Sequence, residues 1–64
     1  MPKISLEAVR VNAKMKQKEW AEILGVSQAT VVNWEKGNTE PTLSQLRTMS
    51  ELSGIPMDFI FVPE

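Results

Sequence analysis

Short polar side chains are concentrated in residues 27–33, which read Ser-Gln-Ala-Thr-Val-Val-Asn. Gln28 and Asn33 each end in an amide with one acceptor oxygen and two donor hydrogens, and such an amide can bond both N6 and N7 of one adenine. The methyl groups of Ala29 and Thr30 match the methyl group of thymine in the major groove. This pattern favours non-covalent reading of base edges, although the same residue types are also ordinary on an exposed helix. The candidate base-reading residues are Ser27, Gln28, Ala29, Thr30 and Asn33.

Two short helices joined by a tight turn are predicted around these residues. Ala21 lies in the middle of the first helical pattern, where a small side chain lets a second helix cross closely. Gly25 can take the positive φ that ends a helix, and Ser27 is a favoured N-cap for the next one. Val31 and Trp34 then repeat at helical spacing, so that both point inward and the polar residues point outward. The pattern is that of a helix-turn-helix.

The order and spacing of these residues resembles the Cro and lambdoid-repressor type of helix-turn-helix DNA-binding domain, from about Leu6 to Phe61. The resemblance implies a compact all-α bundle of five helices that places its third helix in the major groove. It also implies a prokaryotic or phage transcriptional regulator, a repressor or Cro-like protein, that binds a double-stranded DNA operator. The residues that carry the resemblance are Arg10, Gln17, Ala21, Leu24, Gly25, Val26, Ser27, Val31, Trp34, Glu35, Gly37, Pro41, Leu46, Gly54 and Ile55.

Charged and polar residues near the helix-turn-helix are candidates for contacts with the DNA backbone. Arg10 and Glu35 predict an ion pair between the first and third helices, which would leave the guanidinium near a phosphate; two unrelated surface charges are the alternative. Gln17 begins the second helix, where backbone N–H groups favour a phosphate, and the resemblance places it close to Gln28. Some of the nearby lysines can equally be solvated without touching DNA. The candidate phosphate contacts are Arg10, Lys14, Lys16, Gln17, Lys36 and Asn38.

Five helices are predicted from caps and hydrophobic periodicity. Thr42 and Gln45 have the spacing of a capping box, in which each side chain bonds the backbone N–H of the other. Pro56 suits the first turn of a last, short helix. The predicted helices follow Ser5, span residues 17–24, follow Ser27 as far as Lys36, run from Thr42 to Gly54, and run from about Pro56 to Phe61.

Apolar residues near the C-terminus exceed what one face of a short helix can bury. Met57, Ile60 and Phe61 are therefore the predicted contact of a homodimer, with a core that extends to Val62 as the alternative. We expect this dimer to be weak in free solution and to form on a palindromic operator. Val32 is a further apolar residue, at a position where the family usually has a polar one. Val32 can meet a thymine methyl or a protein partner, or pack against its own chain.

The composition restricts the possible functions. The chain has no cysteine and no histidine, so disulfides, thiolate metal sites and the commonest general base are excluded. We expect one domain over residues 1–64, with no catalytic residue, no enzyme activity, no metal, no cofactor and no small-molecule substrate. No apolar run is long enough for a transmembrane helix, and we expect a cytoplasmic protein with no membrane partner.

The charge pattern leaves a second function open. The net charge is −1, but residues 1–18 carry five basic residues and one acidic residue, whereas residues 19–64 carry two basic and seven acidic residues. A basic N-terminal part can attract DNA locally. The acidic remainder favours the alternative of an antitoxin-like or antirepressor-like protein-interaction module on the same fold. Strong salt dependence of DNA binding would favour the first function, and a tight protein complex without DNA affinity the second.

Overall fold

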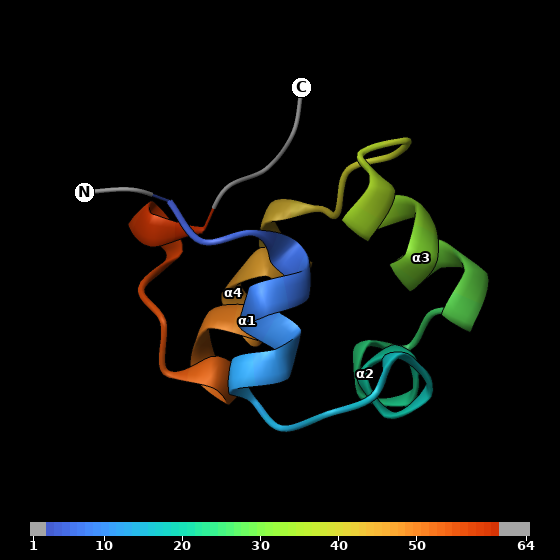
Figure 1. The fold of residues 1–64 in the computed structure, drawn as a ribbon, viewed down its shortest axis with the longest axis horizontal. Helices are drawn as coiled ribbons and strands as arrows, with labels where there is room; N and C mark the ends of the chain where they lie inside the picture. The colour runs from blue at the N-terminus through green and yellow to red at the C-terminus, as the bar shows by residue number, and fades with distance from the viewer. Residues whose placement is uncertain (1–2, 61–64) are drawn as a thin grey trace.

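The computed structural model describes residues 3–60 and contains four α-helices. Helices α1 and α4 lie together, and α2 and α3 form a second pair beside them (Figure 1). A single 3₁₀ turn, η1, follows α4 and packs against it. The elements are α1 (Leu6–Asn12), α2 (Gln17–Leu24), α3 (Gln28–Lys36), α4 (Leu43–Ser53) and η1 (Met57–Phe59).

The prediction of an all-α bundle is confirmed, but the prediction of a fifth helix is not. A helix was expected from Pro56 to Phe61, but within the described part of this segment, residues 56–60, only the three-residue η1 forms. Ile60 then takes an extended conformation, with φ −87° and ψ 124°. The N–H of Ile4 donates to the carbonyl of Phe59 at 2.6 Å, and Ile4 and Ile60 form an isolated parallel bridge. This pairing with the N-terminal segment holds the chain extended where a helix would have continued.

Three of the helix starts follow the predicted local chemistry. The hydroxyls of Ser5 and Ser27 accept from the N–H groups of Ala8 and Thr30, at 3.1 and 3.2 Å. At the start of α4, the Gln45 N–H donates to Thr42 Oγ1 at 3.2 Å, and the Thr42 N–H donates to Gln45 Oε1 at 2.7 Å. These bonds satisfy N–H groups that have no partner inside the helix.

The end of α1 was not predicted. Lys14 has a φ of 61° and is the one non-glycine residue with positive φ among residues 3–60. Its N–H donates to the Val11 carbonyl at 2.9 Å, and the Met15 N–H donates to the Arg10 carbonyl at 3.4 Å. This is the hydrogen-bond pattern of a Schellman motif, whose left-handed position usually belongs to glycine. Gly25 fills that position at the end of α2, with a φ of 72°.

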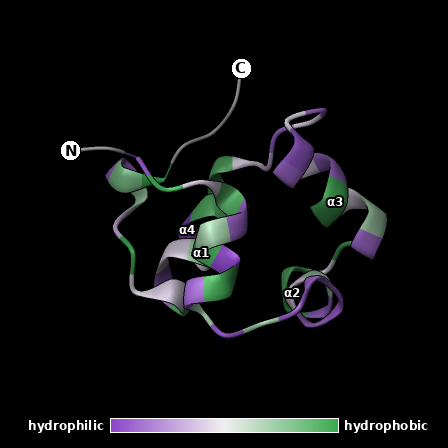
Figure 2. Ribbon diagram, viewed as in Figure 1, coloured by the Kyte–Doolittle hydropathy of each residue, from purple (hydrophilic) through white to green (hydrophobic). Residues whose placement is uncertain are grey.

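The core lies between the two helix pairs, and every helix contributes to it. Apolar and polar residues alternate along α1 and α3, as the green and purple segments of the ribbon show (Figure 2). Trp20 and Trp34 are 1% and 4% exposed, so both indoles are core residues, as was predicted for Trp34. Ala21 is also buried, which lets α2 and α3 pack closely. The buried apolar residues are Leu6, Val9, Trp20, Ala21, Val31, Trp34, Met49, Ile55 and Ile60. None of the helices described is long and apolar enough to cross a membrane.

Candidate nucleic-acid interface

One side of helix α3 is buried against the core, and the opposite side faces solvent. Val31 and Trp34 are its two buried residues and define the inward direction. With about 100° per residue, Ala29 and Lys36 lie about 170° from the mean inward direction. Both are exposed. The centre of the outward face therefore runs from Ala29 in the first turn to Lys36 in the last.

The other residues of α3 flank this line at different distances. By the same helical geometry, Val32 and Asn33 lie about 130° from the inward direction, Gln28 about 90° and Thr30 about 70°. Gln28 is exposed, whereas the other three are partly buried. The structure thus brings Gln28, Ala29 and Asn33 to one outward surface, while Thr30 lies nearer the core.

The hydroxyls of Ser27 and Thr30 are engaged within the protein. Their oxygens lie 2.9 Å apart and share one hydrogen bond. Ser27 Oγ also accepts from the Thr30 N–H as the N-cap of α3. Both residues were predicted to read bases, but their present contacts stabilise the start of the helix.

Asn33 and Asn38 meet at the opposite end of α3. Asn38 Nδ2 donates to Asn33 Oδ1 at 3.4 Å, and the Asn38 N–H donates to the Asn33 carbonyl at 2.9 Å. One predicted base contact and one predicted phosphate contact are therefore neighbours. The side-chain bond uses only the oxygen of the Asn33 amide, so its two amide hydrogens are not engaged by Asn38.

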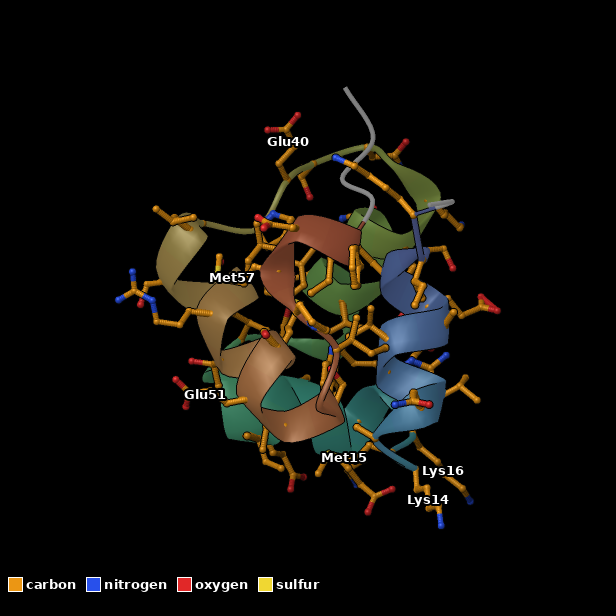
Figure 3. All side chains as sticks on the ribbon, turned by 90° about the vertical axis from the view of Figure 1, so that its left-hand side faces the viewer. Lys14, Met15, Lys16, Glu40, Glu51 and Met57 are labelled. Carbon is orange, nitrogen blue, oxygen red and sulfur yellow. The ribbon has the colours of Figure 1, made fainter. Side chains whose placement is uncertain are left out.

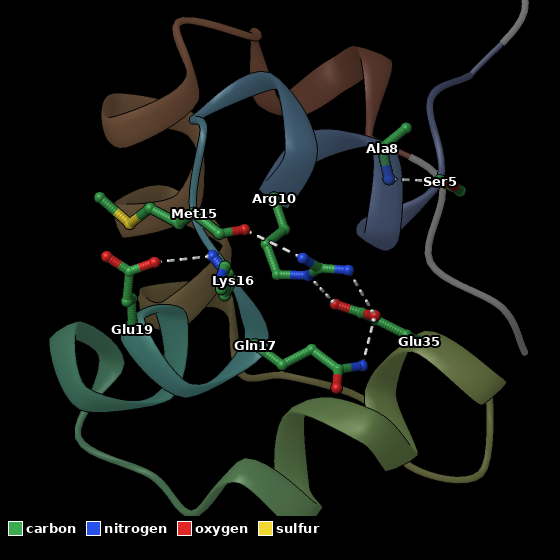
Figure 4. A network of polar contacts seen from close by, with 8 residues as sticks. All are labelled: Ser5, Ala8, Arg10, Met15, Lys16, Gln17, Glu19 and Glu35. Atoms are coloured by element: carbon green, nitrogen blue, oxygen red, sulfur yellow. Dashed lines mark hydrogen bonds and ion pairs between the residues drawn. The ribbon is translucent and has the colours of Figure 1, made fainter.

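Arg10 and Glu35 form the predicted ion pair, and its geometry is that of a fork (Figure 4). Arg10 Nε lies 2.8 Å from Glu35 Oε2, and Arg10 Nη2 lies 3.4 Å from Glu35 Oε1. The two side chains are 14% and 6% exposed. The pair joins α1 to the last turn of α3 from a largely buried position.

Two further hydrogen bonds to Arg10 and Glu35 were not predicted from the sequence. Gln17 Nε2 donates to Glu35 Oε1 at 3.1 Å, and Arg10 Nη1 donates to the Met15 carbonyl at 2.9 Å. Glu35 therefore links its own position near the end of α3 to the end of α1 and to the start of α2 (Figure 4). Because three guanidinium nitrogens are bonded within the protein, the contacts of Arg10 support a structural role over a phosphate contact. No local sequence pattern predicts these bonds, because they depend on how α1, α2 and α3 pack against one another.

Lys14 and Lys16 extend from the connection between α1 and α2 (Figure 3). Both are exposed, as is Lys36 at the end of α3. Lys16 is the N-cap residue of α2 but makes no side-chain cap, and its N–H instead donates to Glu19 Oε1 at 3.1 Å. The predicted cationic residues thus lie just before α2 and at the end of α3, so they flank the helix-turn-helix along the chain.

The prediction that Ile60 is an exposed dimer contact is wrong. Ile60 is 4% exposed and belongs to the core, because its bridge to Ile4 turns its side chain inward. Met57 is partly buried on η1 (Figure 3). Phe61, the third predicted dimer residue, lies outside the described residues.

A family model supports the interpretation of this geometry. The model of the Cro/C1 type of helix-turn-helix matches residues 6–60. The chain belongs to this helix-turn-helix family. Its members are regulators of transcription that bind double-stranded DNA. A search of curated proteins and a search of solved structures each gave no match. Within residues 3–60, no group of three or more acidic, histidine or cysteine side chains is placed to hold a metal ion.

Proposed function

We propose that this helix-turn-helix protein is a repressor or Cro-like regulator that recognises a specific operator by placing α3 in the major groove. The observation that carries the proposal is the outward face of α3, where Gln28 is exposed in the first turn and Ala29 lies opposite the core. An α-helix fits the major groove, and the first turn of the recognition helix is the part that reaches base edges in this motif.

The surroundings of α3 support the same orientation. Lys16 and Lys36 are exposed at the start of α2 and the end of α3, where they would neutralise phosphates on the two sides of the groove. The partly buried network of Arg10, Gln17 and Glu35 fixes α3 relative to the start of α2. The network thereby holds the base-reading residues of α3 and the phosphate-binding residues near the start of α2 in fixed relative positions.

We further propose that two copies bind a palindromic operator. One recognition helix reads only a few base pairs, which is too little for selection among the roughly 10⁶–10⁹ competing sites of a genome. Two copies related by a two-fold axis would place their α3 helices about 34 Å apart in successive major grooves. The DNA would supply the effective concentration for a dimer that is weak in solution.

Selection of bound sequences from random duplexes tests the proposal. We expect a palindromic consensus with two half-sites about one helical turn apart, and binding that weakens steeply as salt is raised. No enriched sequence, together with no affinity for duplex DNA, would contradict the proposal. A tight protein complex found under those conditions would instead identify a protein-interaction module.

A further inference from the structure

An apolar side chain lies on the outward face of α3 among polar ones. Val32 is one turn beyond Ala29, so the two side chains are neighbours on the helix surface. Val32 is partly buried, but within residues 3–60 it is not among the partly buried apolar residues that pack against the core. Its side chain is therefore partly covered and partly open to solvent, and it does not join the core.

We infer that Val32, together with Ala29, reads the 5-methyl group of a thymine in each half-site. The inference rests on the proposed function, because it takes α3 to be the helix in the groove. The methyl group of thymine is the one apolar feature that a base presents in the major groove. An apolar pair on a recognition helix matches that methyl group and no other base edge.

The neighbouring residues favour a DNA groove over a protein partner. Val32 is flanked on the outward face by Gln28, Asn33 and the cationic Lys36. The apolar core of a protein interface is depleted in charged residues, whereas a groove between phosphates favours them. Val32 and Ala29 are thus two apolar residues among polar and charged ones, which suits contact with a single methyl group better than a broad apolar interface.

The side chain of Val32 is also suited to discrimination. A β-branched residue has one strongly preferred χ1 rotamer in a helix, so little side-chain freedom is lost when its methyl groups are fixed against a base. Cytosine and adenine present amino groups in the major groove, and a methyl group placed against one would leave that donor without a partner. Thymine is therefore preferred by attraction of its methyl group, and cytosine and adenine are also disfavoured by their unpaired amino groups.

The test replaces each thymine of the selected operator by deoxyuridine, which removes only the 5-methyl group. With the unaltered protein, we expect one position in each half-site at which the Kd rises about fourfold, the equivalent of about 0.8 kcal/mol for one buried methyl group. At that position, 5-methylcytosine should bind more tightly than cytosine by a similar factor. This second comparison separates the methyl group from the other features of thymine.

Protein variants assign the effect to Val32. In Val32→Ser, the difference between thymine and deoxyuridine should fall to less than twofold at that position. Val11→Ser is the matched control, because Val11 is 58% exposed on α1, and it should retain the full fourfold difference. Thermal melts of both variants check that they fold, and the deoxyuridine series on the unaltered protein needs no variant at all.

The outcomes separate this inference from the proposed function. Absence of specific DNA binding would overturn both. Specific binding with no thymine sensitive to methyl removal, or a fourfold difference that persists in Val32→Ser, would overturn the inference alone. Loss of a protein complex in Val32→Ser, with an unchanged response to deoxyuridine, would assign Val32 to a protein partner and would also overturn it.

Discussion

Replacement of Arg10 by methionine should show how much the stability of the fold depends on the ion pair between Arg10 and Glu35. In Arg10→Met, the Glu35 carboxylate keeps only the bond from Gln17, while its side chain remains 6% exposed. Breaking a buried pair by removing one partner costs about 3–5 kcal/mol, and the remaining Gln17 bond should place this case near the lower limit, at about 3 kcal/mol. A domain of 64 residues has a total stability of roughly 3–10 kcal/mol. The single substitution should therefore remove a large part of the free energy of unfolding.

Urea denaturation of a double-mutant cycle measures this effect. We expect Arg10→Met with Glu35→Leu to be more stable than Arg10→Met alone by at least about 1.5 kcal/mol, because the double variant no longer buries an unpaired charge. The control is the pair Lys18→Met and Glu22→Leu, whose side chains are exposed on one face of α2 and should couple by no more than about 0.5 kcal/mol. If the free energies of the Arg10 and Glu35 variants are additive, the reasoning from burial is refuted.

Three other substitutions test separate parts of the account. Lys14→Gly should be more stable than Lys14→Ala by about 0.5–1 kcal/mol in urea melts, because only alanine keeps a Cβ at a left-handed position; equal stabilities would contradict the positive φ. Ile60→Asp should lower the stability by about 3–5 kcal/mol, since it buries an unpaired charge, whereas Met57→Asp on the partly buried η1 should cost much less. Circular dichroism melts compare the two, and a fully stable Ile60→Asp would remove Ile60 from the core. Lys16→Ala should weaken binding to all duplexes alike and reduce the slope of log Kobs against log salt by about 0.9; a loss confined to one base-pair position would contradict its phosphate role.

Local chemistry explains which parts of the fold were predictable. The caps at Ser27 and Thr42 were predicted because their partners lie three residues away in the sequence. The end of α2 at Gly25 was predicted because glycine is the residue that favours positive φ. Signals of this kind need no knowledge of how the helices pack.

The parts that were missed depend on packing between distant segments. The C-terminal segment leaves the helical conformation because Ile60 bridges Ile4. No residue near Ile60 in the sequence predicts that it pairs with Ile4. Gln17 was expected to contact DNA, and its bond to Glu35 appears only when α2 and α3 are placed together. Lys14 gave no signal because lysine has no preference for the left-handed region.

A substitution at Gln28 gives the sharpest test of whether α3 lies in the major groove. Binding constants of the unaltered protein and of Gln28→Ala should be measured against the selected operator and against all single base-pair changes in one half-site. We expect Gln28→Ala to lose about 1–3 kcal/mol on the selected operator and to lose its preference at one base pair per half-site, while the preferences at the other positions remain. Unchanged affinity and an unchanged preference at every position would contradict a base-reading role for the first turn of α3.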